Sequence, residues 1–335
     1  MRAPAILAAL LALLPPGPAR TGMAEAAKAF SASLDASQRE RATFAVDAET
    51  RKDWHYVPRE RKGLPLGAMT DAQKRALHAL LESALSEDGV RKVDGVILLE
   101  AVLREIEGSP IRDPAHYTVS LFGEPGALGA DVPWGWRLEG HHLSLNFLER
   151  HGRVSVTPWF LGANPERVAS GPHAGLRPLA EEEDLARALA KSLDEEQRAV
   201  GVRATEVPRD VILSPGRAAS FLDPPGIAGS KLRDDQRKDL ARVAALYAGA
   251  LDPALAGDAI DRVRKTPAAD LHFLWIGGLE PGEPHYWRVQ GNRFAIELDN
   301  VQGGAGHVHT LWRDLDDDFG EDLLKRHYEE AHAPR

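Results

Sequence analysis

Apolar residues recur at helical spacing in two segments of the first part of the chain. In residues 72–85 they fall at Leu77, Leu80, Leu81 and Leu85, and residues 93–107 have the same kind of spacing. Spacings of three and four residues place side chains on one face of a helix. The pattern therefore predicts two helices, each with one buried face.

After residue 113 the pattern changes to short segments rich in β-branched and aromatic residues. The segments are HYTVSLFG, WGWRLEG, HHLSLNFLE and RVSVTPWF, and they are punctuated by glycine and proline. Segments of this kind are typical of strands in an antiparallel meander. The first part of the chain is thus predicted to be helices followed by a sheet.

The same succession returns farther along. Helices are predicted at residues 181–199, 234–249 and 255–265, strands at 270–276, 285–291, 293–299 and 307–313, and a last helix at 321–331. Runs of helices followed by runs of strands indicate an α+β fold with a mainly antiparallel sheet, because a doubly wound fold would alternate the two.

Short sequence matches link the two parts. SLDASQR returns as SLDEEQR with five of seven letters identical, and TDAQKRAL, EPG and WRLEG return in the same order as RDDQRKDL, EPG and WRVQG. Generic capping sequences would explain the helical matches, since a cap acceptor precedes Gln by three residues, but not the tryptophan segments. We therefore predict an internal duplication, with halves at residues 25–178 and 179–335 that pack as one compact unit.

Residues 1–24 have the pattern of a secretory signal peptide. Arg2 supplies a positive charge, residues 5–14 form an apolar run, and residues 15–18 end it with prolines. The run is too short to cross a bilayer. Cleavage is expected after Ala19 or near Ala24, which would give a secreted or periplasmic protein with no membrane partner.

Composition narrows the chemistry. The chain has no cysteine, which excludes thiolate catalysis and cysteine-ligated metals. Its net charge of -9 argues against a nucleic-acid partner. The sequence contains no Walker loop, no dinucleotide-binding glycine motif and no Gly-x-Ser-x-Gly elbow, so three common enzyme classes lose support.

The histidines provide the candidate chemistry. His307 and His309 would share one face of a strand, whereas alternation places His142 on the polar face and His141 on the apolar face of another strand. Neighbouring imidazoles suit a metal ion bound at about 2.0–2.1 Å. We predict a transition-metal site with His307 and His309 as ligands and His142 as the third ligand, ahead of Glu297 and Asp299, and with zinc or copper favoured over iron or nickel. His141 would be a further ligand or a hydrogen-bonded core residue.

Five longer segments resemble a known family. They are DWHYVPRERKGLPLGAMT, GHHLSLNF, FLGANP, YWRVQGNRFAIELDN and GHVHTLWRDLDDDFG. Together they are similar to an exported family known as the thirty-five-hundredth domain of unknown function in its series. The family pattern has Asn-His-x-His before Trp-Arg-Asp, whereas Gly306 stands at the asparagine position here. The resemblance implies one fold over nearly the whole mature chain and no established reaction.

These observations predict an exported metal-dependent enzyme with a small-molecule substrate. Glu297 or Asp299 would be a general base or would orient an imidazole, and Arg313, with Arg137 and Arg288, would bind an acidic substrate. Hydrolysis is favoured over oxidation because no redox motif is present. Two alternatives remain: a non-catalytic exported protein that binds a metal or small ligand, and a metal-free enzyme that uses these carboxylates with a histidine.

Overall fold

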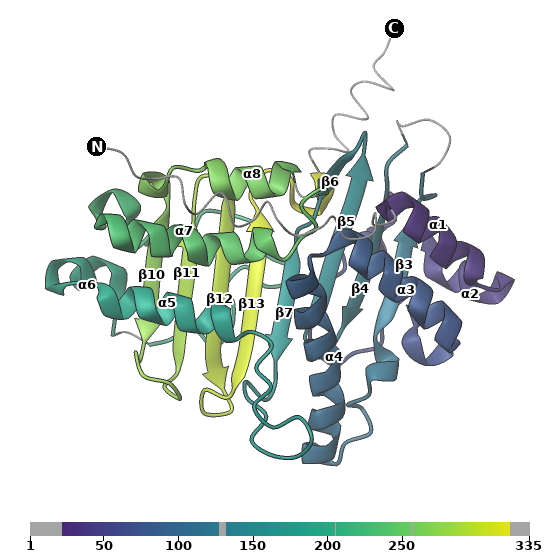
Figure 1. The fold of residues 1–335 in the computed structure, drawn as a ribbon, viewed down its shortest axis with the longest axis horizontal. Helices are drawn as coiled ribbons and strands as arrows, with labels where there is room; N and C mark the ends of the chain where they lie inside the picture. Colours follow the sequence, from purple (N-terminus) through teal and green to yellow (C-terminus); the bar gives the residue numbers. More distant parts are fainter. Residues whose placement is uncertain (1–21, 127–131, 205, 256, 322–335) are drawn as a thin grey trace, which may run out of the picture.

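One continuous sheet forms the centre of the molecule (Figure 1). The computed structural model describes residues 22–126, 132–204, 206–255 and 257–321. The strand order is β1-β3-β4-β5-β7-β13-β12-β11-β10-β8, with β2, β6 and β9 attached beside it. The β1 and β8 strands pair in parallel with β3 and β10, and the other pairs are antiparallel. The fold is therefore α+β, and β7 and β13 join strands from the two parts of the chain.

The strands follow the predicted pattern with two corrections. The first part contributes β1 (Thr43–Phe44), β2 (Leu64–Pro65), β3 (Thr118–Phe122), β4 (Trp134–Gly140), β5 (Leu143–Arg150), β6 (Arg153–Ser155) and β7 (Trp159–Ala163). The second part contributes β8 (Val202–Arg203), β9 (Ile227–Ala228), β10 (His272–Gly277), β11 (His285–Gln290), β12 (Phe294–Gln302) and β13 (His307–Asp314). The predicted strand at residues 153–160 is divided, because Pro158 has no N–H for the ladder. The strand predicted from residue 141 begins at Leu143.

The described residues contain eight α-helices. They are α1 (Met23–Ser33), α2 (Ala36–Ala42), α3 (Asp71–Ala84), α4 (Glu87–Glu107), α5 (Ala180–Ser192), α6 (Glu195–Gly201), α7 (Asp234–Gly249) and α8 (Gly257–Lys265). The helix predicted at residues 181–199 is two helices, since Asp194 caps α6 and ends the continuous run. Helix α4 begins earlier than predicted, after the cap residue Ser86. The helix predicted at residues 321–331 lies outside the described residues.

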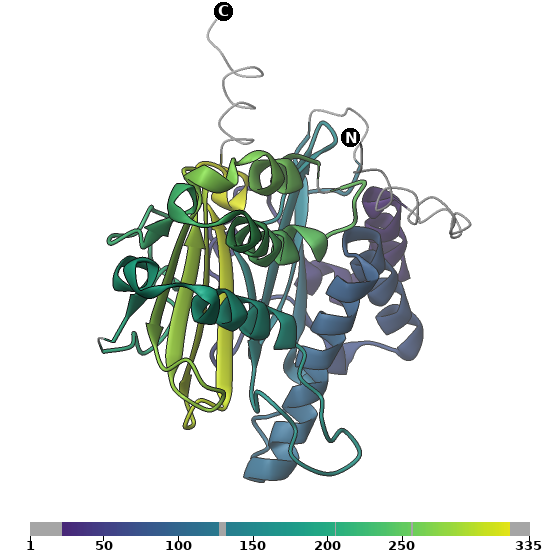
Figure 2. The same cartoon turned by 60° about the vertical axis from the view of Figure 1, so that its left-hand side comes forward.

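The helices cover one face of the sheet and form the main core with it. Figures 1 and 2 show α3, α4, α5 and α7 on this face. Burial of each large apolar side chain stabilises the fold by about 1.5–3 kcal/mol. The sheet side of the core carries six buried tryptophans, namely Trp134, Trp136, Trp159, Trp275, Trp287 and Trp312.

Two loops cover the opposite face of the sheet. Residues 45–63 lie over the first part and residues 206–226 over the second, and together they enclose a second, smaller apolar cluster. Its members are Trp54, Tyr56, Phe160, Val211, Leu213, Ala295 and Leu311. Ionisable side chains on this face, such as Arg137 and Glu297, are therefore buried under loops rather than exposed to solvent.

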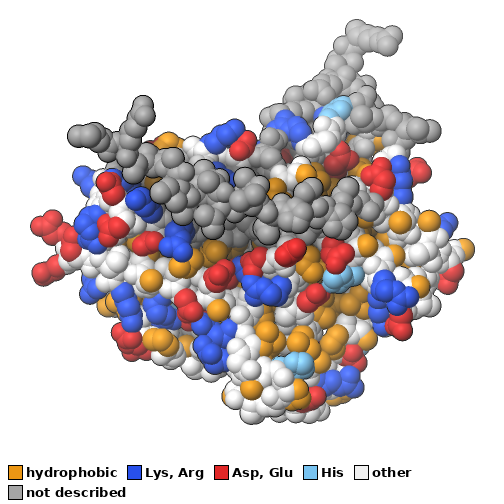
Figure 3. All heavy atoms as spheres, viewed as in Figure 1, with side chains coloured by type: hydrophobic (Ala, Val, Ile, Leu, Met, Phe, Trp, Pro, Cys, Tyr) orange, Lys and Arg blue, Asp and Glu red, His pale blue; other side chains and the backbone are white. Residues whose placement is uncertain are grey.

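The outer surface over the helices is mixed in charge. Figure 3 shows basic and acidic side chains interspersed on this side of the molecule. Within the described part of the chain, no helix combines the length and the apolar character that a membrane crossing requires.

Candidate metal centre

Three histidine side chains converge from two distant segments. The Nε2 atom of His142 lies 2.7 Å from Nε2 of His307 and 3.4 Å from Nε2 of His309. Nitrogens bound at about 2.0–2.1 Å to a tetrahedral ion lie about 3.3 Å from one another. The longer distance matches this spacing, and the shorter one requires a small rotation of one ring. The triad of His142, His307 and His309 therefore has a geometry that could hold a metal ion.

Strand β13 places two members of the triad. His307 and His309 alternate along a continuous strand, so both side chains point to the face covered by the loops. Their ring centroids are 4.6 Å apart.

His142 reaches the triad from a turn rather than from a strand. The sequence prediction placed it on the polar face by strand alternation. His142 does point to that face, but it precedes β5 and has a left-handed φ of 64°, so strand alternation is not the cause. Its backbone is fixed on both sides: its N–H donates to the carbonyl of Tyr56, and its carbonyl accepts from the N–H of Gly162. This turn aims the imidazole of His142 at β13.

Gly162 leaves the space that the His142 ring occupies. It lies in β7 directly opposite His309. A Cβ atom at this position would lie 2.9 Å from ring atoms of His142, which is closer than real Cβ contacts. A glycine is therefore required here by contact rather than by backbone conformation.

Two carboxylates face the far side of His309. Its Nδ1 lies 3.0 Å from Oδ1 of Asp210 and 3.6 Å from Oδ2 of Asp299. A proton on Nδ1 leaves the lone pair of Nε2 directed at the triad, as in carboxylate–histidine–metal arrangements. Burial lowers the pKa of His309, but the hydrogen bonds and charges of Asp210 and Asp299 outweigh it and raise the pKa to about 9. At neutral pH His309 therefore carries a proton on both ring nitrogens, and a metal ion at this place would displace the proton from Nε2.

The other two histidines are held neutral. Burial, together with the charge of His309, lowers the pKa of His307 to about 3. Burial and the neighbouring histidines bring the pKa of His142 well below its usual value. Neutral imidazole is the form that binds metal ions.

Asp299 is a buried carboxylate with little compensation. It is fully inaccessible to solvent, and within the described residues neither of its oxygens has a hydrogen-bond partner at ordinary bonding distance. Burial is the main cause that raises the pKa of Asp299 to about 6. A buried charge normally requires a paired charge or a metal ion. The carboxylate therefore adds to the attraction for a cation at this place.

His141 lies outside the triad but supports it. Its Nδ1 is 2.5 Å from Oε2 of Glu100, and Nη1 of Arg112 is 3.0 Å from its Nε2. Both ring nitrogens are thus engaged by side chains other than the triad. Its ring stacks on His142 with centroids 3.7 Å apart. His141 is therefore a buried, hydrogen-bonded residue against which His142 packs.

Glu297 anchors a covering loop. It accepts hydrogen bonds from the backbone N–H groups of Ile212 and Leu213 at 2.7 and 2.9 Å and from the hydroxyl of Tyr286 at 2.8 Å. These bonds occupy both carboxylate oxygens and hold the loop that carries Asp210. Asp299 is the carboxylate of β12 that faces the triad.

Arg313 also binds the covering loop. Its guanidinium pairs with Asp318 at 2.6 Å and donates to the backbone carbonyls of Leu213 and Arg217. Arg137 and Arg288 likewise donate to carbonyls in the two covering loops, those of Arg51, Leu222 and Pro224. These three arginines hold loops on the sheet in this structure.

Sequence reasoning missed three residues of this centre. Asp210 lies in a loop without periodicity, so no local pattern marked it. Gly162 resembled any strand glycine. The ring of Tyr56 stacks on that of Phe160, and its centroid lies 5.1 Å from the ring centroid of His309. No sequence pattern indicated this role for Tyr56. All three act through contacts between segments far apart in the sequence.

A family model described as "Protein of unknown function (DUF3500)" matches residues 17–321. The chain belongs to the DUF3500 family. The family resemblance seen in the sequence is thereby confirmed. Comparison with curated proteins and with solved structures gave no match for this DUF3500 protein. Gly306, at the asparagine position of the expected pattern, would accept a side chain, because an added Cβ would meet its nearest atom at 3.4 Å.

Proposed function

We propose that this DUF3500 protein is a metal-dependent enzyme in which His142, His307 and His309 are the ligands. The observation that carries the proposal is the convergence of three Nε2 atoms, with Asp210 and Asp299 behind one of them. Three protein ligands leave a coordination position for water or substrate. A metal ion at this place would supply a bound water with a pKa of about 7.

The donor set favours zinc or copper. All three donors are imidazole nitrogens, which suit these ions better than calcium or magnesium. The carboxylates of Asp210 and Asp299 behind His309 both favour a cation. Hydrolysis is preferred to oxidation, because three histidines with an open position are typical of zinc sites that activate water.

The nearby carboxylates have separate roles in this proposal. Asp210 orients His309 through the 3.0 Å contact with its Nδ1. Asp299 is the general base or shares the orienting role, since its oxygens have no other hydrogen-bond partner. Glu297 accepts hydrogen bonds from the backbone of the covering loop, so it is a positioning residue for Asp210.

A second candidate function is non-catalytic metal binding. His142 and His309 are 4% and 3% exposed, so access to the triad is from the side of His307, which is partly exposed. Such enclosure favours retention of an ion. The two functions differ in coordination, because an enzyme keeps an exchangeable water and a carrier saturates the ion with protein ligands.

Elemental analysis of protein purified without a histidine tag tests the metal. We expect about one equivalent of zinc or copper, either as purified or after dialysis against the ion. Less than about a tenth of an equivalent under both conditions would contradict the proposal and favour a metal-free enzyme.

A panel of ester, amide and phosphoester substrates then tests catalysis. Turnover by the metal-loaded protein that disappears in His307→Ala supports the enzyme. Stoichiometric metal with no turnover on the panel, and with no exchangeable water in the absorption spectrum of the cobalt-substituted protein, supports the carrier.

We also propose that the protein is exported and that cleavage follows Ala19. Helix α1 begins at Met23, and the indole N–H of Trp136 points to the sulfur of this buried methionine at 3.4 Å. Cleavage near Ala24 would remove Met23 from the core. N-terminal sequencing of the exported protein should give Arg20 as the first residue; a start after Ala24 would contradict this choice.

We further propose that the two parts arose by duplication. In the first part, Gln38 and Gln73 exchange hydrogen bonds and donate to the carbonyls of Ala68 and Ser33. The corresponding residues of the second part are Gln197, Gln236, Lys231 and Ser192. Shared capping sequences alone do not account for these tertiary bonds. Superposition of the parts in an experimental structure tests the proposal, since the glutamine pairs should coincide.

A further inference from the structure

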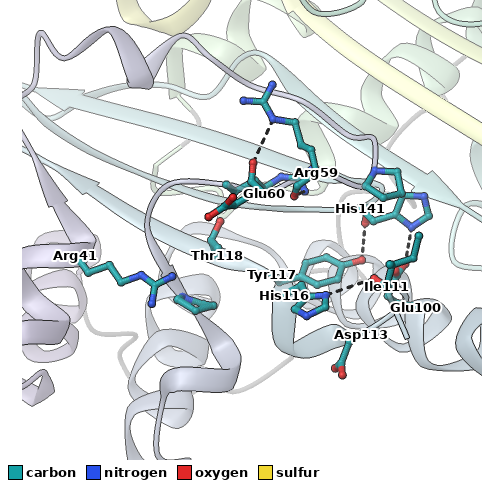
Figure 4. A pocket seen from close by; sticks show the side chains of 13 residues that line it. Arg41, Arg59, Glu60, Glu100, Ile111, Asp113, His116, Tyr117, Thr118 and His141 are labelled. Carbon is teal, nitrogen blue, oxygen red and sulfur yellow. Dashed lines mark hydrogen bonds and ion pairs between the residues drawn. The ribbon is translucent and has the colours of Figure 1, made fainter. Parts of the chain in front are cut away.

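A cavity of about 440 Å³ lies beside the candidate metal centre, under the covering loop of the first part (Figure 4). It is bounded by residues 58–65, by the short helix η3 (Pro114–His116) and by the start of β3. Its size is that of a small-molecule site. Much of the lining is apolar and comes from Pro58, Pro65, Ile111 and Tyr117.

One polar group in this lining lacks a partner. Thr118 is 4% exposed, and its hydroxyl has no hydrogen-bond partner among the described residues. The neighbouring hydroxyl of Tyr117, in contrast, donates to the carbonyl of His141. The hydroxyl oxygen of Thr118 is also sealed from solvent, so a molecule in the cavity cannot reach it, and a polar anchor for such a molecule must come from the charged groups.

Most charged groups around the cavity are already paired. The pairs are Arg61 with Glu139, Arg59 with Asp53, Asp113 with Arg104, and Glu100 with His141. Arg41 is different, because its Nε donates to the carbonyl of Gly63 and its guanidinium forms no ion pair with a described residue. Figure 4 shows Arg41 at one end of the cavity and His141 at the other.

We propose that this cavity binds a small organic monocarboxylate. The carboxylate pairs with Arg41, and the apolar body lies against Tyr117 and Ile111. A guanidinium is well suited to a carboxylate because it offers two parallel donors. Glu60, which also lines the cavity, repels any anion, but it repels a doubly charged anion such as phosphate more than a monocarboxylate.

The site is distinct from the metal centre but shares a wall with it. His141 lines the cavity and stacks on His142 at 3.7 Å, and no member of the triad lines the cavity. Binding of the carboxylate therefore does not require the metal. Carboxylate binding in the cavity and metal binding at the triad are therefore independent properties, and each can be tested without the other.

Calorimetric titration with benzoate and phenylacetate tests the proposal. Their neutral amides and inorganic phosphate are the comparison ligands, and each titration is repeated in His307→Ala to remove any contribution of a metal. We expect the carboxylates to bind in both proteins and the amides and phosphate to bind at least about tenfold more weakly.

Two variants locate the binding. Arg41→Gln should weaken carboxylate binding about tenfold. Arg75→Gln is the matched control, because it removes an exposed arginine of α3 that does not line the cavity. No binding of either carboxylate, equal binding of the amides, or equal effects of Arg41→Gln and Arg75→Gln would overturn the proposal. Carboxylate binding that is lost in His307→Ala would assign the ligand to the metal instead and would also overturn it.

Discussion

The two parts of the sheet meet at Trp159 and Trp312, which face each other in β7 and β13. Three and five residues before Trp159 are Val156 and Val154, which are buried in the main core on the helical side. The same steps before Trp312 lead to His309 and His307, which face the covering loops. Positions at the same sequence spacing from the central tryptophans thus carry core valines in the first part and loop-facing histidines in the second part.

The difference depends on the continuity of one strand. In the first part the strand is interrupted between β6 and β7, whereas β13 runs without interruption through both histidines. The first part contributes in another way, through His142 in the turn before β5. The corresponding turn of the second part has Arg293, which pairs with Asp316 on the surface. The candidate centre therefore forms where the two parts differ in sequence. The first part contributes His142, and the second part contributes His307 and His309.

The largest expected effect is the loss of bound metal when a candidate ligand of either part of the chain is replaced. His142→Ala, His307→Ala and His309→Ala should each reduce bound metal from about one equivalent to below about a tenth. Elemental analysis after dialysis measures this. His173→Ala, at an exposed position, is the matched control and should keep the metal. If the variant of one part retains metal while those of the other lose it, the site does not span the two parts.

The carboxylates behind His309 should have the next largest effect. Asp210→Asn and Asp299→Asn keep the side-chain size but remove the charge, and each should weaken metal affinity about 10–100-fold. Competition with a chelator of known affinity measures the change. Glu149→Gln, on the first part of the sheet, should leave the affinity unchanged, because Glu149 bonds with Trp134 and Gly152. Unchanged affinity in both aspartate variants would remove their proposed orienting role.

Gly162→Ala tests the first part's contribution without changing a ligand. The added methyl group must displace the ring of His142, because the contact would be 2.9 Å. Overpacking of this kind typically costs about 1–3 kcal/mol, and metal affinity should fall with it. Thermal denaturation and chelator competition measure the two quantities. Gly152→Ala is a useful comparison, since an added Cβ meets nothing within 4 Å, although its positive φ adds strain. A fall in stability in Gly162→Ala with full metal affinity would show that His142 is not a ligand.

The smallest effect on metal is expected for His141→Ala. Its loss leaves Glu100 and Arg112 without their bonds to the imidazole, which should cost about 1–3 kcal/mol of stability. The metal content should remain about one equivalent, because the ring nitrogens of His141 point to other partners. Denaturation and elemental analysis of the same preparation distinguish a loss of stability from a loss of metal. Metal loss equal to that of His142→Ala would make His141 a ligand.

Much of the fold could be predicted because its elements depend on local patterns. Helix α7 and strands β11 and β13 lie within a residue or so of their predicted bounds, since apolar periodicity and turn residues determine them. The two-residue strands β1 and β8 were not predicted, because their pairing with β3 and β10 is a tertiary contact. The break before β7 was missed although Pro158 marked it.

The triad was predicted from parity and spacing, and His307 and His309 behave as that reasoning required. His142 reached the triad for a different reason than predicted, because a left-handed residue in a turn does not follow strand alternation. The prediction that Glu297 and Arg313 act in chemistry did not consider the covering loops, whose backbone groups these side chains bind. No local pattern specifies which loop lies over which strand.

The order of assembly follows from how far apart the members of the triad lie in the chain. His142 is separated from His307 by 165 residues and from His309 by 167. Closure of such long loops is slow and comes late in folding. A nascent or partly folded chain therefore has at most the local pair of His307 and His309, and His142 joins this pair only when β7 and β13 come together. An ion bound here would not guide folding. It would stabilise the completed pairing of β7 and β13 and slow the separation of these two strands.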